Sequence, residues 1–291
     1  MRLVTFLEGG EPRLGALRGE GARQEVVDLN RADTALPAEM IPLLQGGPEA
    51  LARVRRVLDA APAGAWRPLA AVTLRAPLPR PGKIICIGLN YRDHAAESAV
   101  AVPDYPTVFA KYASCVIGSG EAIVLPKLSD QVDYEGELGV VIGRTARHVP
   151  ESSALEYVAG YLPFNDVSAR DFQHRTSQWT IGKTFDTFGP MGPALVTADE
   201  VPDPQNLNLR VRIGDEVLQS SNTGKMIFSI AHLIAYLSAV LTLEPGDVIA
   251  TGTPEGVGAA RTPARFLRPG EVVRVEIEAL GTLENPIVAG R

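Results

Sequence analysis

Residues 133–143 have the sequence DYEGELGVVIG, in which two glutamates stand beside a run of apolar residues. The run at 138–142 is typical of a buried β-strand. Because side chains alternate across a strand, Glu135 and Glu137 are expected to point to the same face. The stretch therefore predicts a buried strand that carries a pair of carboxylates at one end.

This carboxylate pair has two interpretations. Two neighbouring carboxylates repel each other, and burying them unpaired is costly. A divalent cation removes both costs, and ligand sets made only of oxygen favour Mg²⁺, Mn²⁺ or Ca²⁺ over zinc. The alternative is a solvated strand end with Glu135 and Glu137 on the surface.

Strand-like segments on both sides of this stretch predict a β-rich fold. They are KIICIG (83–88), LRVRIG (209–214), GDVIATG (246–252) and VVRVEIEALG (272–281). Three segments look helical: 93–99, 167–175 and 227–241. The lack of a regular alternation of strands and helices argues against a doubly wound parallel sheet. We expect a mixed, β-rich α+β fold.

The first 75 residues differ from the rest. Three short strand-like runs precede a helical stretch at 38–60 that is interrupted by GGP at 46–48, and a segment rich in Ala and Pro follows. We therefore expect a small N-terminal α+β domain with its linker over residues 1–75. A catalytic domain over residues 76–291 is expected to follow.

Composition excludes some classes of protein. The net charge is −6 and no basic stripe is present, which argues against a nucleic-acid partner. No apolar run approaches the length of a membrane span, and no secretory signal is visible. Cys86 and Cys115 have no metal-binding spacing and are expected as buried thiols in a reducing compartment. These features predict a cytoplasmic protein.

A second polar constellation lies in PFNDVSARDFQHR, residues 163–175. If a helix begins near Asp166, then Asp166, Arg170 and Gln173 share one face. Such a face offers an acid, a guanidinium and an amide to a small anionic ligand. The alternative is a helix-capping Asp166 with an exposed Arg170 and Gln173.

A third constellation, GLNYRDHAAES at 88–98, holds His94 and Glu97 at helical i, i+3 spacing. A carboxylate beside an imidazole orients the ring and stabilises its protonated form, as general-base catalysis requires. The alternative is a surface His–Glu pair. Of the other histidines, His174 is expected behind the ligand-contacting residues, and His232 in the core of its helix.

Two weaker signals follow. Lys183 lies among apolar residues in WTIGKTFDTFGPMGP (179–193), either snorkelling at the surface or aimed into a site, and the segment lacks the spacing of a phosphate loop. ATGTPEGVG (250–258) is either an ordinary turn or a backbone nest for an anion, with Thr253 adding a hydroxyl.

In this order, the motifs resemble the fumarylacetoacetate hydrolase superfamily over about residues 83–288. The matching strings are IGLNYRDHAAES, DYEGELGVVIG, NDVSARDFQ, QWTIGKTFDTFGPMGP, NTGKMIF and PGDVIATGTPEGVG. The resemblance implies a β-sandwich or β-roll catalytic domain and a homodimer. It also implies that Mg²⁺ or Mn²⁺, or else Ca²⁺, is bound through Glu135, Glu137 and Asp166.

The same resemblance implies roles for other residues. His94 and Glu97 would form a water-activating pair on a short lid helix, and Lys183 would stabilise developing negative charge. The residues expected near the substrate are Arg170, Gln173, Thr253 and Lys111. Lys111 matches a family lysine usually followed by proline, whereas Tyr112 follows it here. No further carboxylate ligand is found upstream, so water is expected to complete the metal shell.

The implied substrate is a small 2-oxo acid. The first expectation is hydrolysis of a carbon–carbon bond in an acylpyruvate, or a similar 1,3-diketone, through a metal-stabilised enolate. Oxaloacetate decarboxylase and 5-carboxymethyl-2-hydroxymuconate isomerase are the enzyme alternatives. The non-enzyme alternative is a catalytically silent, ligand-binding member of the family.

Overall fold

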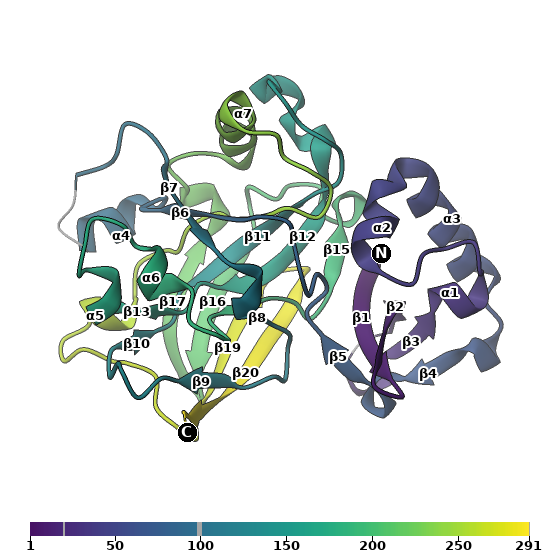
Figure 1. Cartoon of the computed structure of the whole chain (residues 1–291), viewed down its shortest axis with the longest axis horizontal. Coiled ribbons are helices and arrows are strands. Elements are labelled where there is room, and N and C mark those ends of the chain that lie inside the picture. The colour runs from purple at the N-terminus through teal and green to yellow at the C-terminus, as the bar shows by residue number, and fades with distance from the viewer. Residues whose placement is uncertain (20, 98–100, 291) are drawn as a thin grey trace.

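The computed structural model describes residues 1–19, 21–97 and 101–290. In this part of the chain, eleven strands form one large sheet and five form a second (Figure 1). The large sheet runs, in spatial order, through β4 (Trp66–Pro68), β3 (Glu25–Asp28), β2 (Glu11–Arg18), β1 (Arg2–Glu8), β15 (Leu195–Thr197), β12 (Val158–Asn165), β11 (Gly136–Ile142), β18 (Val248–Ala250), β6 (Ile84–Gly88) and β7 (Thr107–Lys111), with β5 (Thr73–Arg75) beside β1.

The second sheet has the order β17 (Glu216–Asn222), β16 (Asn208–Ile213), β19 (Val272–Ile277), β20 (Gly281–Ala289) and β9 (Ile123–Leu125). Two short pairs join β10 (Val132–Asp133) to β13 (Ser168–Ala169) and β8 (Val116–Ile117) to β14 (Gly189–Pro190). The helices are α1 (Leu29–Ala32), α2 (Met40–Gln45), α3 (Gly47–Ala60), α4 (Arg92–Glu97), α5 (Arg170–Gln173), α6 (Thr180–Lys183) and α7 (Ile230–Val240). The expected mixed, β-rich α+β class with a β-sandwich core is confirmed.

Strand β11 lies at the centre of both hydrophobic layers. Val140 and Ile142 pack into the core that β11 shares with the second sheet, whereas Val141 packs into the core on the opposite face of the large sheet, with α2 and α3. A strand covered on both faces needs apolar residues in succession. This double burial explains why LGVVI does not alternate with polar residues.

The N-terminal strands belong to the same large sheet. Arg2 and Leu3 of β1 pair with Val196 and Leu195 of β15, so the sheet continues from the first strand into the rest of the molecule. The helical break expected at residues 46–48 is confirmed, because α2 ends at Gln45 and α3 begins at Gly47. The boundary near residue 75 stays a prediction about separate folding units.

The helix expected at 167–175 is wrong. Ser168–Ala169 form β13, which pairs with β10, and the amide of Arg170 donates to Gln131 O at 3.0 Å. These long-range bonds leave one helical turn, α5, which begins at Arg170. Asp166 therefore lies before the helix and shares no helical face with Arg170 and Gln173.

The other two expected helices are found. Ser229 caps α7, which spans 230–240 of the expected 227–241. His232 on α7 is not in the core: its side chain is 40% exposed and pairs with Glu151. Helix α4 covers the expected segment up to Glu97, and residues 98 and 99 lie outside the described residues.

The structure also describes the two cysteines and the apolar character of the helices. Cys86 and Cys115 are both buried free thiols, as expected. Among the residues that the structure describes, no helix combines the length and the apolar character needed to span a bilayer.

Candidate active site

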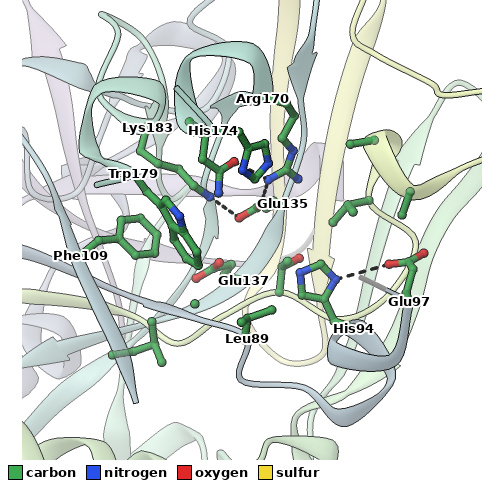
Figure 2. A pocket seen from close by; sticks show the side chains of 17 residues that line it. Leu89, His94, Glu97, Phe109, Glu135, Glu137, Arg170, His174, Trp179 and Lys183 are labelled. Carbon is green, nitrogen blue, oxygen red and sulfur yellow. Dashed lines mark hydrogen bonds and ion pairs between the residues drawn. The ribbon is translucent and has the colours of Figure 1, made fainter. Parts of the chain in front are cut away.

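A cavity of about 340 Å³ gathers residues from distant parts of the chain. It is lined by side chains from β6, α4, β7, β11, α5 and α6 and from the loop after β18 (Figure 2). Eight of the ten residues singled out from the sequence line this cavity. Of the other two, Asp166 binds the lining residue Lys183, and Lys111 binds Asp166. The sandwich thus brings the separate sequence motifs to one place.

Three carboxylates meet at the bottom of the cavity. Glu135 directly precedes β11, Glu137 lies within it, and Asp166 directly follows β12. Since Gly136 pairs with Asn165, this register sets both glutamates beside Asp166, whose amide donates to Glu135 O at 2.9 Å. One oxygen from each carboxylate lies within 4.8 Å of the others, and all three residues are buried.

Three cations neutralise much of this charge. Lys183 Nζ lies 2.7 Å from Glu135 Oε2 and 2.9 Å from Asp166 Oδ2. Lys111 Nζ lies 2.6 Å from Asp166 Oδ1 and donates to Val167 O. Lys111 is therefore buried and bound to Asp166 and Val167, with Tyr112 as the next residue.

Arg170 is the third cation. Its guanidinium binds Glu135 Oε1 at 2.5 Å and Asp133 Oδ2 at 2.8 Å. It also donates to the side-chain oxygen of Gln173 at 2.9 Å. Arg170 thus holds Glu135 from the side opposite Lys183 and fixes the orientation of the Gln173 amide, as Figure 2 shows for Arg170, Glu135 and Lys183.

The pKa values of Glu135 and Glu137 shift in opposite directions. Burial opposes ionisation of Glu135, but Lys183 and Arg170 outweigh it and lower the pKa of Glu135 to about 2. Burial raises the pKa of Glu137 well above its ordinary value, and the nearby carboxylates of Asp166 and Glu135 raise it further. The reason is that no cation pairs with Glu137 among the described residues, and its one donor is the amide of Gly252 at 2.8 Å.

These residues fit a divalent cation. The converging atoms are all carboxylate oxygens, the ligands that Mg²⁺, Mn²⁺ and Ca²⁺ prefer. Glu137, which is 1% exposed, is the buried carboxylate left without a cationic partner in the described part of the chain. An ion beside it would supply the charge that the protein does not.

Helix α4 presents His94 to the cavity. His94 Nδ1 lies 3.4 Å from Glu97 Oε2, and His94 is buried. Glu97 also accepts hydrogen bonds from the amide of Gly256, at 3.0 and 3.1 Å. Gly256 has a φ of +97°, and a Cβ there would lie 2.2 Å from Leu218 O, so glycine is required where this loop meets α4.

Residues 250–258 have two interpretations, an ordinary turn or a nest for an anion, and the contacts of the glycine amides do not support the nest. The amides of Gly252, Gly256 and Gly258 donate to Glu137, Glu97 and Asp133 of the protein itself. The glycine-rich loop therefore orients the carboxylates of the site. Thr253 does line the cavity, but its hydroxyl donates to Gly136 O and accepts from Gln219.

Sequence reasoning missed Asp133 and gave His174 no contact with the ligand. Asp133 is fully buried and accepts hydrogen bonds from Gly258, Ala259 and Arg170. Its position two residues before Glu135 is the signal that could have indicated it. His174 lines the cavity directly. Phe109 and Trp179 line it as well, and their rings meet edge to face with 5.5 Å between the ring centroids.

Comparison with known proteins narrows the activity. Residues 83–288 match the family described as fumarylacetoacetate (FAA) hydrolase, C-terminal. The chain is 47% identical over 293 residues to an oxaloacetate tautomerase of Rattus norvegicus, covering 99% of this chain and 92% of that protein.

Two solved structures resemble the whole chain. The 5-carboxymethyl-2-hydroxymuconate delta-isomerase of Mycobacterium smegmatis has a TM-score of 0.79 at 36% identity, with both chains fully covered. Maleylpyruvate hydrolase of Sphingobium sp. SYK-6, in complex with manganese and pyruvate, has a TM-score of 0.83 at 34% identity, again with both chains fully covered.

The cytoplasmic location expected from the sequence is contradicted by these comparisons. The rat tautomerase is named a mitochondrial protein, and relatives from Xenopus laevis and Homo sapiens carry the same designation. The expectation rested on the lack of a secretory signal, which says nothing about other organelles.

Proposed function

The chain belongs to the fumarylacetoacetate hydrolase family, and we propose that this enzyme uses a divalent metal to interconvert the keto and enol forms of a small 2-oxo dicarboxylic acid such as oxaloacetate. The observation that carries the proposal is the meeting of the Glu135–Glu137–Asp166 cluster and the His94–Glu97 pair at one cavity. The first supplies a binding site for a divalent ion, and the second supplies a proton-transfer group. The tautomerase name of the rat relative agrees with this division.

A divalent ion held by Glu135, Glu137 and Asp166 would supply Lewis-acid polarisation of the 2-oxo and carboxylate oxygens. Tautomerisation then moves one proton from carbon 3 of the substrate to the 2-oxo oxygen. His94 would take the proton from carbon 3 and return it to the 2-oxo oxygen, and Glu97 would orient the ring and stabilise its charged form between the two transfers. Lys183, which is buried and positively charged beside Glu135, would stabilise the negative charge that develops on the oxygen.

Hydrolysis of an acylpyruvate is the second candidate. Phe109 and Trp179 give the cavity an apolar wall, which offers a surface for an acyl arm that oxaloacetate lacks. The same His94–Glu97 pair would then take a proton from water instead of from carbon. The maleylpyruvate hydrolase neighbour supports this alternative.

The test follows the enol form of oxaloacetate by its ultraviolet absorbance after mixing with enzyme and Mg²⁺ or Mn²⁺. The expected result is decay of the enol that is faster than with the metal alone and that excess EDTA abolishes. His94→Gln should lose this activity, whereas His232→Gln, a histidine on α7 outside the cavity, should retain it. Cleavage of acylpyruvates without tautomerase activity would favour the second candidate, and loss of neither activity in His94→Gln would refute the role of the pair.

We also propose that the enzyme is a homodimer. Val108 of the edge strand β7 and Tyr112, which directly follows this strand, are 44% and 60% exposed, and Ile181 on neighbouring α6 is 57% exposed. An apolar edge of this kind is a liability unless something covers it. Sedimentation at micromolar concentration tests the proposal, and a monomer would refute it. The division into residues 1–75 and 76–291 likewise stays a proposal.

A further inference from the structure

The charged groups around the proposed metal site nearly balance one another. The buried carboxylates are Asp133, Glu135, Glu137 and Asp166. All except Glu137 are paired with cations, which are Lys111, Arg170 and Lys183. With every group ionised, four negative charges face three positive charges. A divalent ion would therefore leave the site with one net positive charge, which matches a substrate carrying a single negative charge.

A 2-oxo dicarboxylate carries two negative charges, so its second carboxylate needs a partner that this cluster does not provide. Lys183 and Arg170, the cations that line the cavity, are already held by Glu135, Asp166 and Asp133. An unpaired carboxylate in a partly enclosed site is costly. Discrimination for a dicarboxylate therefore requires a further donor in the cavity wall.

His174 is the side chain that fits this requirement. Of the ionisable residues lining the cavity, it is the one whose side chain has no hydrogen-bond or ion-pair partner within residues 1–19, 21–97 and 101–290. Its backbone is fixed as the cap of α5, because its amide donates to Arg170 O at 3.1 Å. Figure 2 shows the ring beside Arg170 and above Glu135.

The ring lies close enough to the charged groups of the site for them to shift its pKa. Burial lowers the pKa of His174, the cations Arg170 and Lys183 lower it further, and Glu135 opposes them. Either ring nitrogen, once protonated, donates a hydrogen bond to an anion. A substrate carboxylate placed against the ring would offset the influence of the two cations.

We propose that His174 is a specificity-determining residue that binds the second carboxylate of a 2-oxo dicarboxylate and so distinguishes it from a 2-oxo monocarboxylate. The inference rests on the proposed function for the substrate class. It assigns to the residue following Gln173 a contact with the part of the substrate that lies away from the metal.

The experiment compares two ligands that differ in one group. Oxaloacetate and 2-oxobutanoate share carbons 1 to 3, and a methyl group of the second replaces the second carboxylate of the first. Binding of each to the protein in Mg²⁺ is measured by calorimetry, and KM and kcat are measured for oxaloacetate. The variants are His174→Gln, His174→Arg, which keeps N–H donors at this position, and Arg175→Gln as the matched control. Arg175 is the next residue, 53% exposed, stacked on Phe172 and absent from the cavity wall.

A charge-assisted hydrogen bond at a partly exposed site is worth about a factor of ten in affinity. We therefore expect His174→Gln to reduce the preference for oxaloacetate over 2-oxobutanoate about tenfold, and to raise KM while kcat changes less than about twofold. His174→Arg should keep the preference within about threefold, and Arg175→Gln should leave it unchanged. Circular dichroism checks that each variant is folded.

Three outcomes would overturn the inference: a wild-type protein without preference for the dianion, an unchanged preference in His174→Gln, or an equal loss of both ligands. The last would show that His174 only supports the structure. If the wild-type protein binds oxaloacetate selectively through His174 but does not tautomerise it, the proposed function fails while the inference stands. The two proposals are thus tested separately.

Discussion

Replacing Lys111 by methionine tests the charge balance of the site. Lys111 is 2% exposed, and its ammonium group lies 2.6 Å from Asp166 Oδ1. Methionine keeps the length and most of the apolar contacts of the side chain but removes the charge and the donor. Asp166 then keeps one cationic partner, Lys183 at 2.9 Å.

The expected loss of stability depends on whether a divalent ion is present. Removing one partner of a buried ion pair costs about 3–5 kcal/mol, because the remaining charge stays buried. Since Lys183 still compensates Asp166, we take the lower value, about 3 kcal/mol, for the metal-free protein. At about 2 °C per kcal/mol for a chain of this size, Tm should fall by about 6 °C in EDTA. A bound divalent ion would also compensate Asp166, so the fall in excess Mg²⁺ should be about half as large.

The assay is thermal unfolding of the wild-type protein and Lys111→Met, in EDTA and in excess Mg²⁺. Lys127→Met is the matched control, because Lys127 is exposed and has no ion pair in the described part of the chain. It should change Tm by less than about 1 °C in either condition. An unchanged Tm for Lys111→Met in EDTA, or an equal fall with and without Mg²⁺, would refute the reasoning that Lys111 offsets the charge of the proposed metal ligands.

Three further predictions concern the same site. Excess EDTA should abolish turnover, and added Mg²⁺ or Mn²⁺ should restore it. Calorimetry should show that Asp166→Asn binds the metal more weakly than the wild-type protein does. Full activity in EDTA would contradict the metal proposal. His94→Ala should lower kcat by about 10²- to 10⁴-fold without changing metal affinity, as expected for a general acid–base group, and an unchanged rate would assign proton transfer elsewhere. In EDTA, the pKa of Glu135 lies at about 2, below its ordinary value of 4.5. The stability from this carboxylate is therefore complete above about pH 4.5 and is lost as the pH falls toward about 2, so the Tm of Glu135→Gln should decline less over that range than that of the wild-type protein.

The sequence predicts the strands better than the helices around the site. The run of apolar residues in β11 is visible because both faces of this strand are buried, and the apolar content of α7 is visible because one face of this helix packs into the core. Around 166–173 the sequence has helical spacing, but the amide of Asp166 donates to Glu135 O and Ser168 pairs with Asp133 of β10, and local spacing cannot reveal these bonds. Long-range pairing decided the structure there.

In the candidate site too, local sequence predicts some features and long-range contacts determine others. Glu135 and Glu137 are close in sequence, so the alternation of a strand already predicts that they converge. The ion pairs of Lys183 with Glu135 and of Lys111 with Asp166 join segments far apart in the chain, and only the fold or a family resemblance can supply them. The loop at 250–258 shows a further limit, because its glycines indicate available amides but not that Glu97, Glu137 and Asp133 occupy them.

The pairing of β1 with β15 has a consequence for engineering the protein. A truncated chain that begins after residue 75 would leave Leu195 and Val196 without the strand that now covers them, although both are buried in the intact fold. Unpaired edge strands of apolar character recruit other chains and cause aggregation. Shortened variants for crystallisation or fusion should therefore retain β1, or carry a charged or proline substitution on β15 that blocks new pairing.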